Sequence, residues 1–125
     1  ATQVKIEENL TVFADANALK TILTNIYSNA IKFSNHGAAI SILAHAQKKT
    51  TVIKIIDYGV GMTPQQIDNA FNLLNTKSTK GTNNEKGTGF GLLLCKELIQ
   101  LHQGSLTINS KINKGTTIII ELLSS

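Results

Sequence analysis

The sequence predicts a two-layer α/β sandwich, in which one mixed β-sheet is covered by helices on one face. The 125 residues suffice for one domain with a real core. Short β-branched runs lie at both ends of the chain, and most of them are joined by turns short enough for hairpins. Two segments whose apolar residues repeat with helical spacing lie between them. We therefore expect residues 1–125 to form a single domain.

The first half of the chain is predicted to hold four strands and one long helix. Residues 4–7 and 11–14 are expected as two short strands joined by a turn. Asp15 is a good N-cap residue, and apolar residues at helical spacing follow it. Residues 38–46 and 51–56 are expected to form a hairpin.

The second half is predicted to hold two helices and the two closing strands. A short helix is expected over residues 63–70, with Pro in its first turn. Residues 75–89 contain no apolar side chain, and so long a loop in a compact domain is usually a lid or a binding loop. A leucine-rich helix is expected to open near Gly91, and strands are expected at 105–110 and 116–123.

Composition excludes several classes of protein. The single cysteine, Cys95, rules out an internal disulfide and a cysteine-based zinc cluster, and its leucine-rich surroundings predict a buried position. The net charge of +4 comes from Lys alone, because the sequence has no Arg, which disfavours a nucleic-acid reader. A small ligand that carries phosphate suits these lysines. No apolar run approaches the roughly 20 residues that span a bilayer, so direct membrane contact is not expected.

A polar stripe follows one edge of the long helix. Asn25, Asn29 and Lys32 are spaced i, i+4 and i+7, which places them on one side of the helix. An amide oxygen is a suitable ligand for Mg²⁺, and a lysine one turn further on could meet a phosphate. The alternative is that these side chains are ordinary helix surface or satisfy a neighbouring loop.

Two glycine-rich segments complete the candidate site. Asp57, Gly59 and Gly61 follow a strand, where a carboxylate can accept from an exocyclic amine and glycines allow close backbone approach, although turn chemistry explains the same pattern. Gly87, Gly89 and Gly91 precede the leucine-rich helix, an arrangement that aims backbone N–H groups at an anion or merely makes a lid flexible. The spacing fits neither a Walker A loop nor the Rossmann fingerprint.

The order of four motifs resembles the N, G1, G2 and G3 boxes of the ATP-binding catalytic domain of sensor histidine kinases. They are Asn-x-x-x-Asn-Ala-x-Lys-Phe from Asn25, Asp-x-Gly-x-Gly-Met from Asp57, Gly-Thr-Gly-Phe-Gly-Leu from Gly87 and Lys-Gly-Thr-Thr from Lys114. The resemblance covers residues 4–123 and implies the Bergerat sandwich. Residues 71–74 lie where the F box belongs, and Leu74 departs from its usual second Phe.

The resemblance also implies roles for individual residues. Asp57 would receive the adenine amine with Gly59 and Gly61 close to the ring, and Thr116 would help to hold a water on the adenine side. Asn29 would ligate Mg²⁺, assisted by Asn25. The residues implied on the phosphate side are Lys32 for direct contact, Gly87 and Gly89 for the lid, and Gly91 for the opening of the helix.

The function implied is binding of Mg·ATP and transfer of its γ-phosphoryl group to a histidine on a separate dimerisation domain, for relay to a response regulator. The domain is expected in the cytoplasm, and its parent protein is either soluble or anchored in the inner membrane. His36, His45 and His102 are expected to be structural. Two alternatives stay open: a Bergerat ATPase or serine kinase, which generally has Glu where this chain has Asn25, and a binding module without chemistry.

Overall fold

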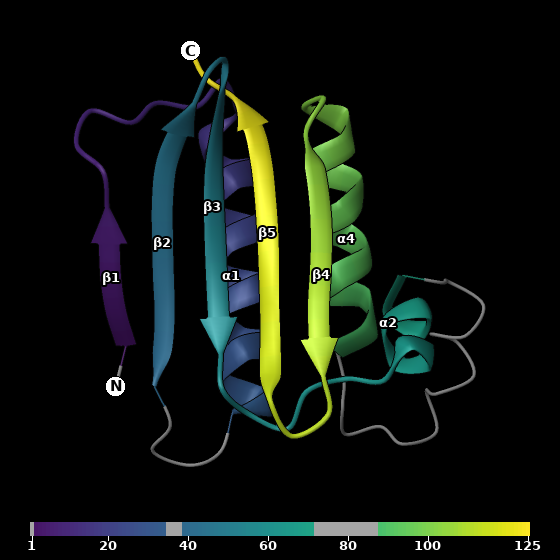
Figure 1. The fold of residues 1–125 in the computed structure, drawn as a ribbon. Coiled ribbons are helices and arrows are strands. Elements are labelled where there is room, and N and C mark those ends of the chain that lie inside the picture. Colours follow the sequence, from purple (N-terminus) through teal and green to yellow (C-terminus); the bar gives the residue numbers. More distant parts are fainter. Residues whose placement is uncertain (1, 35–38, 72–87) are drawn as a thin grey trace.

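A computed structural model describes residues 2–34, 39–71 and 88–125 of the chain. The elements, in chain order, are β1 (Thr2–Ile6), α1 (Ala16–Phe33), β2 (Ile40–Gln47), β3 (Thr50–Asp57), α2 (Pro64–Phe71), α4 (Thr88–Leu101), β4 (Ser105–Lys111) and β5 (Gly115–Leu123). The strands form one five-stranded sheet in the order β1-β2-β3-β5-β4 (Figure 1). β1 is parallel to β2, and the other neighbouring pairs are antiparallel. The sheet is therefore mixed, as predicted.

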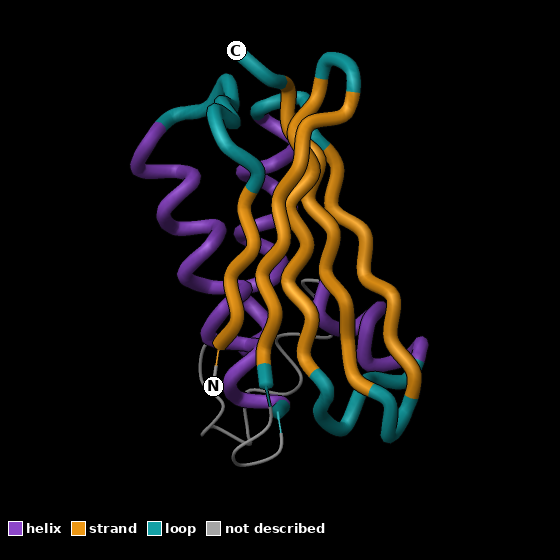
Figure 2. The backbone as a smooth tube through the Cα atoms, turned by 60° about the vertical axis from the view of Figure 1, so that its left-hand side comes forward, coloured by secondary structure: helices purple, strands orange, loops and turns teal. Residues whose placement is uncertain are grey.

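The helices α1 and α4 pack against each other and cover one face of the sheet (Figures 1 and 2). Ile22 and Ile26 of α1 and Ile99 of α4 are fully buried between the two layers. Cys95 is also fully buried, as expected from its surroundings. The sheet contributes Ile40, Ile53, Ile55, Ile118, Ile120 and Leu122 to the same core. These contacts confirm the predicted two-layer architecture.

The start of α1 is fixed by its predicted cap. The Asp15 side chain accepts a hydrogen bond from the backbone N–H of Ala18 at 2.8 Å, which satisfies one of the free donors of the first turn. At the other end, the Ser34 hydroxyl donates to the Ala30 carbonyl at 2.6 Å. Between these caps, Ile22, Ile26 and Ala30 are buried in the core, whereas Ile31 is exposed. The helix predicted after Asp15 is confirmed.

The strand predicted over residues 11–14 is wrong. β1 pairs in parallel with β2, so the chain leaves the edge of the sheet and crosses back to α1 instead of forming a hairpin. This crossing makes isolated hydrogen bonds: Phe13 N–H donates to the Leu123 carbonyl at 2.7 Å, and the Thr51 hydroxyl donates to the Thr11 carbonyl at 2.8 Å. Residues 11–14 therefore belong to the connection between β1 and α1, because they do not pair along their length with a neighbouring strand.

The helix predicted to open near Gly91 begins earlier, at Thr88. Gly89 therefore lies in the first turn of α4 and not in a loop, and Gly91 lies inside the helix. A Cβ at Gly91 would lie 3.7 Å from Asn25 Oδ1, an ordinary contact distance, so α1 and α4 approach each other here without requiring glycine. Residues 72–87, which include Gly87 and most of the predicted lid and F box, lie outside the described residues.

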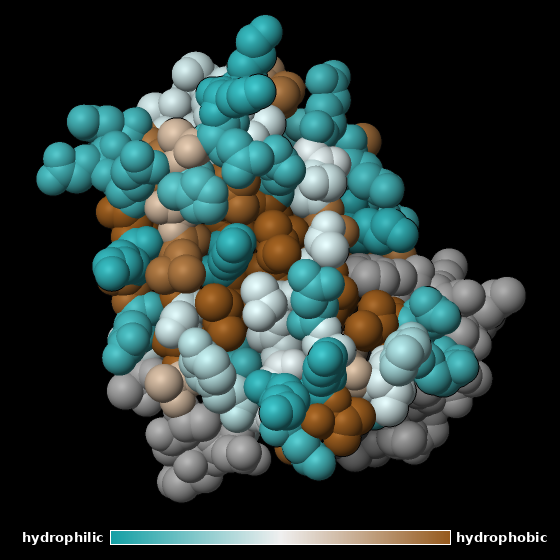
Figure 3. Space-filling view, viewed as in Figure 1, coloured by the Kyte–Doolittle hydropathy of each residue, from teal (hydrophilic) through white to brown (hydrophobic). Residues whose placement is uncertain are grey.

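One face of the sheet is covered by helices, and the opposite face is open. None of the described helices covers the face seen in Figure 3, where apolar surface lies inside a polar border. Strand alternation and register assign Leu43, Val52, Ile56 and Ile119 to this open face. Asp57, one residue further along β3 than Ile56, therefore points to the opposite side, toward the helices.

Candidate functional site

Three polar side chains form a row across the end of the sheet. Asp57 of β3 pairs with Thr116 of β5, and Thr116 pairs with Ser110 of β4. Because paired residues point to the same face, all three side chains lie on the helix side. Asp57 and Thr116 are each only 5% exposed. Buried polar groups need partners, so the row is a specific structure and not incidental turn chemistry.

The Asp57 carboxylate is held by two backbone donors. Its Oδ1 accepts from Gly59 N–H at 2.9 Å, and the backbone N–H of Thr116 also hydrogen-bonds to the carboxylate. Burial raises the pKa of Asp57, and these two hydrogen bonds partly oppose the rise. When ionised, this group is an acceptor that has lost much of its water, so a ligand with an N–H donor would relieve its desolvation.

We expect Asp57 to titrate above the ordinary aspartate value of 3.8 in the ligand-free folded chain. The folded state then binds a proton at pH values where the unfolded chain has released it, so the contribution of Asp57 to folding becomes more favourable as the pH falls through its folded pKa. The measurement is the ¹³C chemical shift of the Asp57 carboxyl carbon against pH, with the urea-unfolded chain as control. Equal midpoints in the two states would contradict the burial argument.

Two glycines allow the neighbouring loops to meet. Gly61 has φ +75°, and a Cβ there would lie 2.0 Å from the Lys111 carbonyl oxygen. Gly115 has φ +110°, and its Cβ would lie 2.2 Å from the Asp57 carbonyl oxygen. Both positions combine a left-handed backbone with contact to another main chain, which only glycine accepts. The predicted contact of Gly59 and Gly61 with a ring stays a prediction.

Ser110 connects the row to the loop after β3, and sequence reasoning missed it. Its Oγ is 2.7 Å from Met62 N, 3.0 Å from the Gly115 carbonyl oxygen and 2.7 Å from Thr116 Oγ1. The available signal was a hydroxyl residue at an inward position of β4, two positions beyond Ile108.

A hollow of about 490 Å³ at this end of the sheet is lined by Asp57, Ser110 and Thr116, among others, and reaches the open face at Ile56.

The polar stripe of α1 lies near the start of α4. Asn25 is half-buried against Gly91, and its side chain hydrogen-bonds Cys95. Burial raises the pKa of the Cys95 thiol to about 11, against a smaller opposite effect of Asn25, so the thiol stays protonated at neutral pH. Asn29 is half-buried and Lys32 is exposed, further toward the end of α1.

The C-terminal end of α1, the start of α4 and the end of β3 lie at the same end of the molecule (Figure 1). The structure therefore brings the predicted amide stripe, the Asp57 row and a helix N-terminus to one region. A helix N-terminus presents unpaired N–H groups and a partial positive charge to an anion. Within the described residues, His, Cys, Asp and Glu form no cluster that could bind a metal ion. An amide oxygen such as that of Asn29 is a suitable ligand for Mg²⁺.

The chain belongs to the family described as histidine kinase-, DNA gyrase B- and HSP90-like ATPases, whose model matches residues 14–125. Its relatives in sequence include bacterial sensor proteins. It is 32% identical over 108 residues to the sensor protein SrrB of Staphylococcus aureus strain NCTC 8325, a match that covers 86% of this chain and 18% of the sensor protein. The chain thus matches less than a fifth of that relative.

Solved structures show the same fold. The catalytic domain of the histidine kinase ThkA superposes with a TM-score of 0.79 at 24% identity, covering 98% of this chain and 78% of that one. The mycobacterial sensor histidine kinase MprB gives 0.78 at 24% identity, with 98% and 80% covered. Full-length ShkA in complex with AMPPNP gives 0.78 at 20% identity, with 100% and 26% covered. Among residues 2–34, 39–71 and 88–125, no helix combines the length and apolar composition needed to cross a membrane.

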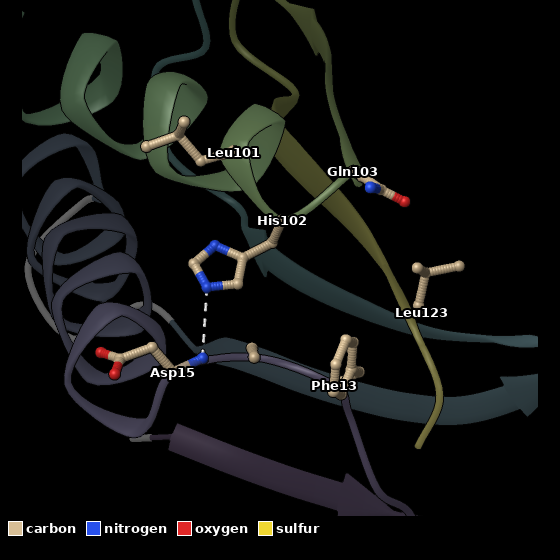
Figure 4. Close-up of a pocket in the computed structure, with 7 residues that line it drawn as sticks. Phe13, Asp15, Leu101, His102, Gln103 and Leu123 are labelled. Atoms are coloured by element: carbon tan, nitrogen blue, oxygen red, sulfur yellow. Dashed lines mark hydrogen bonds between the residues drawn. The ribbon is translucent and has the colours of Figure 1, made fainter.

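His102 lies far along α4 from this site, just past the C-terminal end of the helix (Figure 4). Its Nε2 accepts from the backbone N–H of Asp15 at 3.2 Å, and its Nδ1 lies 2.8 Å from the Leu98 carbonyl oxygen. A carbonyl only accepts, so Nδ1 carries the hydrogen and the ring is neutral. The His102 ring thus joins the end of α4 to the start of α1, which is the structural role expected for it.

Proposed function

We propose that this chain binds Mg·ATP and presents the γ-phosphoryl group to a histidine on the dimerisation domain of a sensor histidine kinase. The observation that carries the proposal is the buried Asp57 carboxylate, held by two backbone N–H groups beside Thr116 at the end of the sheet. Membership of the ATPase family supports nucleotide binding at this position. The relay to a response regulator and a cytoplasmic location are part of the same proposal.

The nucleoside end of the proposed site is the row formed by Asp57, Thr116 and Ser110. The exocyclic amine of adenine donates to the Asp57 carboxylate, because an ionised carboxylate only accepts. Guanine has a carbonyl oxygen where adenine has this amine, and two acceptors repel each other. Thr116, paired with Asp57 across β3 and β5, lies beside the same atoms of the base. The site should therefore prefer adenine nucleotides.

The phosphate end of the proposed site uses α1 and the start of α4. Asn29 would hold Mg²⁺ with Asn25 as a second ligand, and Lys32 would contact a phosphate oxygen. The first turn of α4, which includes Gly89, directs N–H groups toward the phosphates, and Gly87 precedes it in the chain. When bound, Mg²⁺ neutralises phosphate charge.

In the proposed phosphoryl transfer, no residue of this chain forms a covalent bond to the phosphoryl group. A nitrogen of the acceptor imidazole attacks the γ-phosphorus, the bond to the β,γ-bridging oxygen breaks, and ADP leaves. This chain orients the nucleotide and offsets charge, while the acceptor histidine belongs to the partner domain. Asn25 cannot take a proton at neutral pH, so water is not activated from this position. That difference from a carboxylate disfavours the rival ATPase or serine kinase function.

Binding and transfer can be measured separately. Calorimetry of the 125-residue chain should show Mg²⁺-dependent binding of ATP and clearly weaker binding of GTP. With radiolabelled ATP, the chain alone should neither label itself nor release phosphate at an appreciable rate. A separately made dimerisation domain with its acceptor histidine should become labelled when both are mixed. Equal affinity for ATP and GTP would contradict the adenine assignment, and rapid hydrolysis by the chain alone would favour the ATPase. ATP binding without any transfer would favour a binding module.

A further inference from the structure

The hydroxyl of Ser110 has a defined hydrogen-bond arrangement. The Gly115 carbonyl, 3.0 Å away, can only accept, so it takes the single hydrogen of Ser110 Oγ. Met62 N–H donates to the same oxygen at 2.7 Å. Thr116 Oγ1 is 2.7 Å away, and because the Ser110 hydrogen is already used, Thr116 must be the donor in this contact. Ser110 therefore donates once and accepts twice, which uses its full capacity.

This arrangement fixes the orientation of the Thr116 hydroxyl. A threonine hydroxyl normally rotates to donate or accept as its partner requires. Here its hydrogen points to Ser110, so Thr116 Oγ1 is an acceptor toward any other group that approaches. Asp57, beside it on β3, is also an acceptor when ionised, and both residues are only 5% exposed. The side chains of Asp57 and Thr116 thus both present acceptors to an approaching group.

We propose that Ser110 is a positioning residue for base selection, which acts by holding the Thr116 hydroxyl as an acceptor beside Asp57. The inference rests on the proposed function, namely recognition of an adenine base at Asp57. An exocyclic amine has two N–H donors and suits two acceptors, whereas the guanine carbonyl oxygen would face the two acceptors of Asp57 and Thr116. Without Ser110, the Thr116 hydroxyl can turn and donate to that oxygen. Ser110 also anchors the loop at Met62, so its removal affects overall affinity as well as selectivity.

The selectivity for adenine over guanine nucleotides distinguishes a positioning role of Ser110 from a merely structural one. We expect Ser110→Ala to lower the ratio of ADP to GDP affinity on the order of tenfold, about what one or two neutral hydrogen bonds supply. Calorimetry with Mg·ADP and Mg·GDP measures the ratio. Ser110→Thr, which retains a hydroxyl, should restore most of it. If Ser110→Ala does not fold, Ser110→Cys is nearly isosteric, and its weakly accepting sulfur should lower the ratio in the same direction.

A double-mutant cycle tests whether Ser110 acts through Thr116. Thr116→Val removes the hydroxyl that Ser110 orients, so adding Ser110→Ala to this variant should leave the affinity ratio unchanged. An unchanged ratio in the Ser110→Ala single variant, or an equal loss in both backgrounds, would overturn the proposal while leaving the nucleotide site intact. Wild-type protein that binds ADP and GDP equally would instead overturn the adenine assignment itself, and the positioning role with it.

Discussion

Replacing Asp57 by Asn should weaken ATP binding roughly a hundredfold, because a hydrogen bond to a charged group contributes about 1.5–3 kcal/mol. The amide also has one oxygen where the carboxylate has two. The backbone N–H groups of Gly59 and Thr116 both donate to this side chain. Turning the oxygen to them directs the amide NH₂ at the adenine amine, where two donors oppose each other. The preference for ATP over GTP should fall together with the affinity.

Calorimetry of wild type and variant with both nucleotides measures this effect. Asp68→Asn is the matched control, because it makes the same chemical change at an exposed position of α2. That variant should bind ATP as the wild type does. Thermal unfolding should show that Asp57→Asn remains folded, since loss of a buried charge offsets part of the lost hydrogen bonding. An Asp57→Asn chain that keeps wild-type affinity would exclude Asp57 as the base-recognition residue.

Most of the fold was predictable because its signals are local. Asp15 caps α1 as its residue type predicts, and the hairpin between β2 and β3 follows from two β-branched runs around a short turn. Residues 11–14 have the same local signal as a strand, but a strand also needs a neighbour. The neighbouring positions beside β3 are filled by β2 and β5, and β1 occupies the edge next to β2. Such competition between distant segments is invisible in a local pattern.

Part of the candidate site was likewise predictable from the sequence, and part of it was not. Asp57 and Thr116 belong to sequence motifs, and the structure brings them together as paired residues of β3 and β5. Ser110 has no motif of its own, because its importance comes from the register of β4 against β5 and from the loop that brings Met62 to it. The sequence predicts that the helix opens near Gly91, whereas α4 begins three residues earlier, at Thr88. Tertiary packing, and not spacing, gives Ser110 its role.

Gly115→Ala should destabilise the chain on the order of 3 kcal/mol or more, by backbone strain and by direct collision. Its φ of +110° is a conformation that alanine rarely adopts, and the added Cβ would lie 2.2 Å from the Asp57 carbonyl oxygen and 2.9 Å from Tyr58 Cα. These are main-chain atoms, so no side chain can rotate away. β5 must then move away from the end of β3, which separates Thr116 from Asp57 and removes a backbone donor from the carboxylate.

Gly91→Ala is the matched control for this substitution. Its new Cβ would lie at an ordinary 3.7 Å from Asn25 Oδ1, and replacing Gly by Ala within a helix contributes up to about 1 kcal/mol of stability. Thermal unfolding should therefore give opposite shifts, with the midpoint of Gly115→Ala lower by roughly 10 °C and that of Gly91→Ala unchanged or higher. Nucleotide titration at a temperature where both chains are folded completes the comparison. A Gly115→Ala chain with wild-type stability and affinity would show that the turn before β5 can move without disturbing Asp57, contrary to the packing described above.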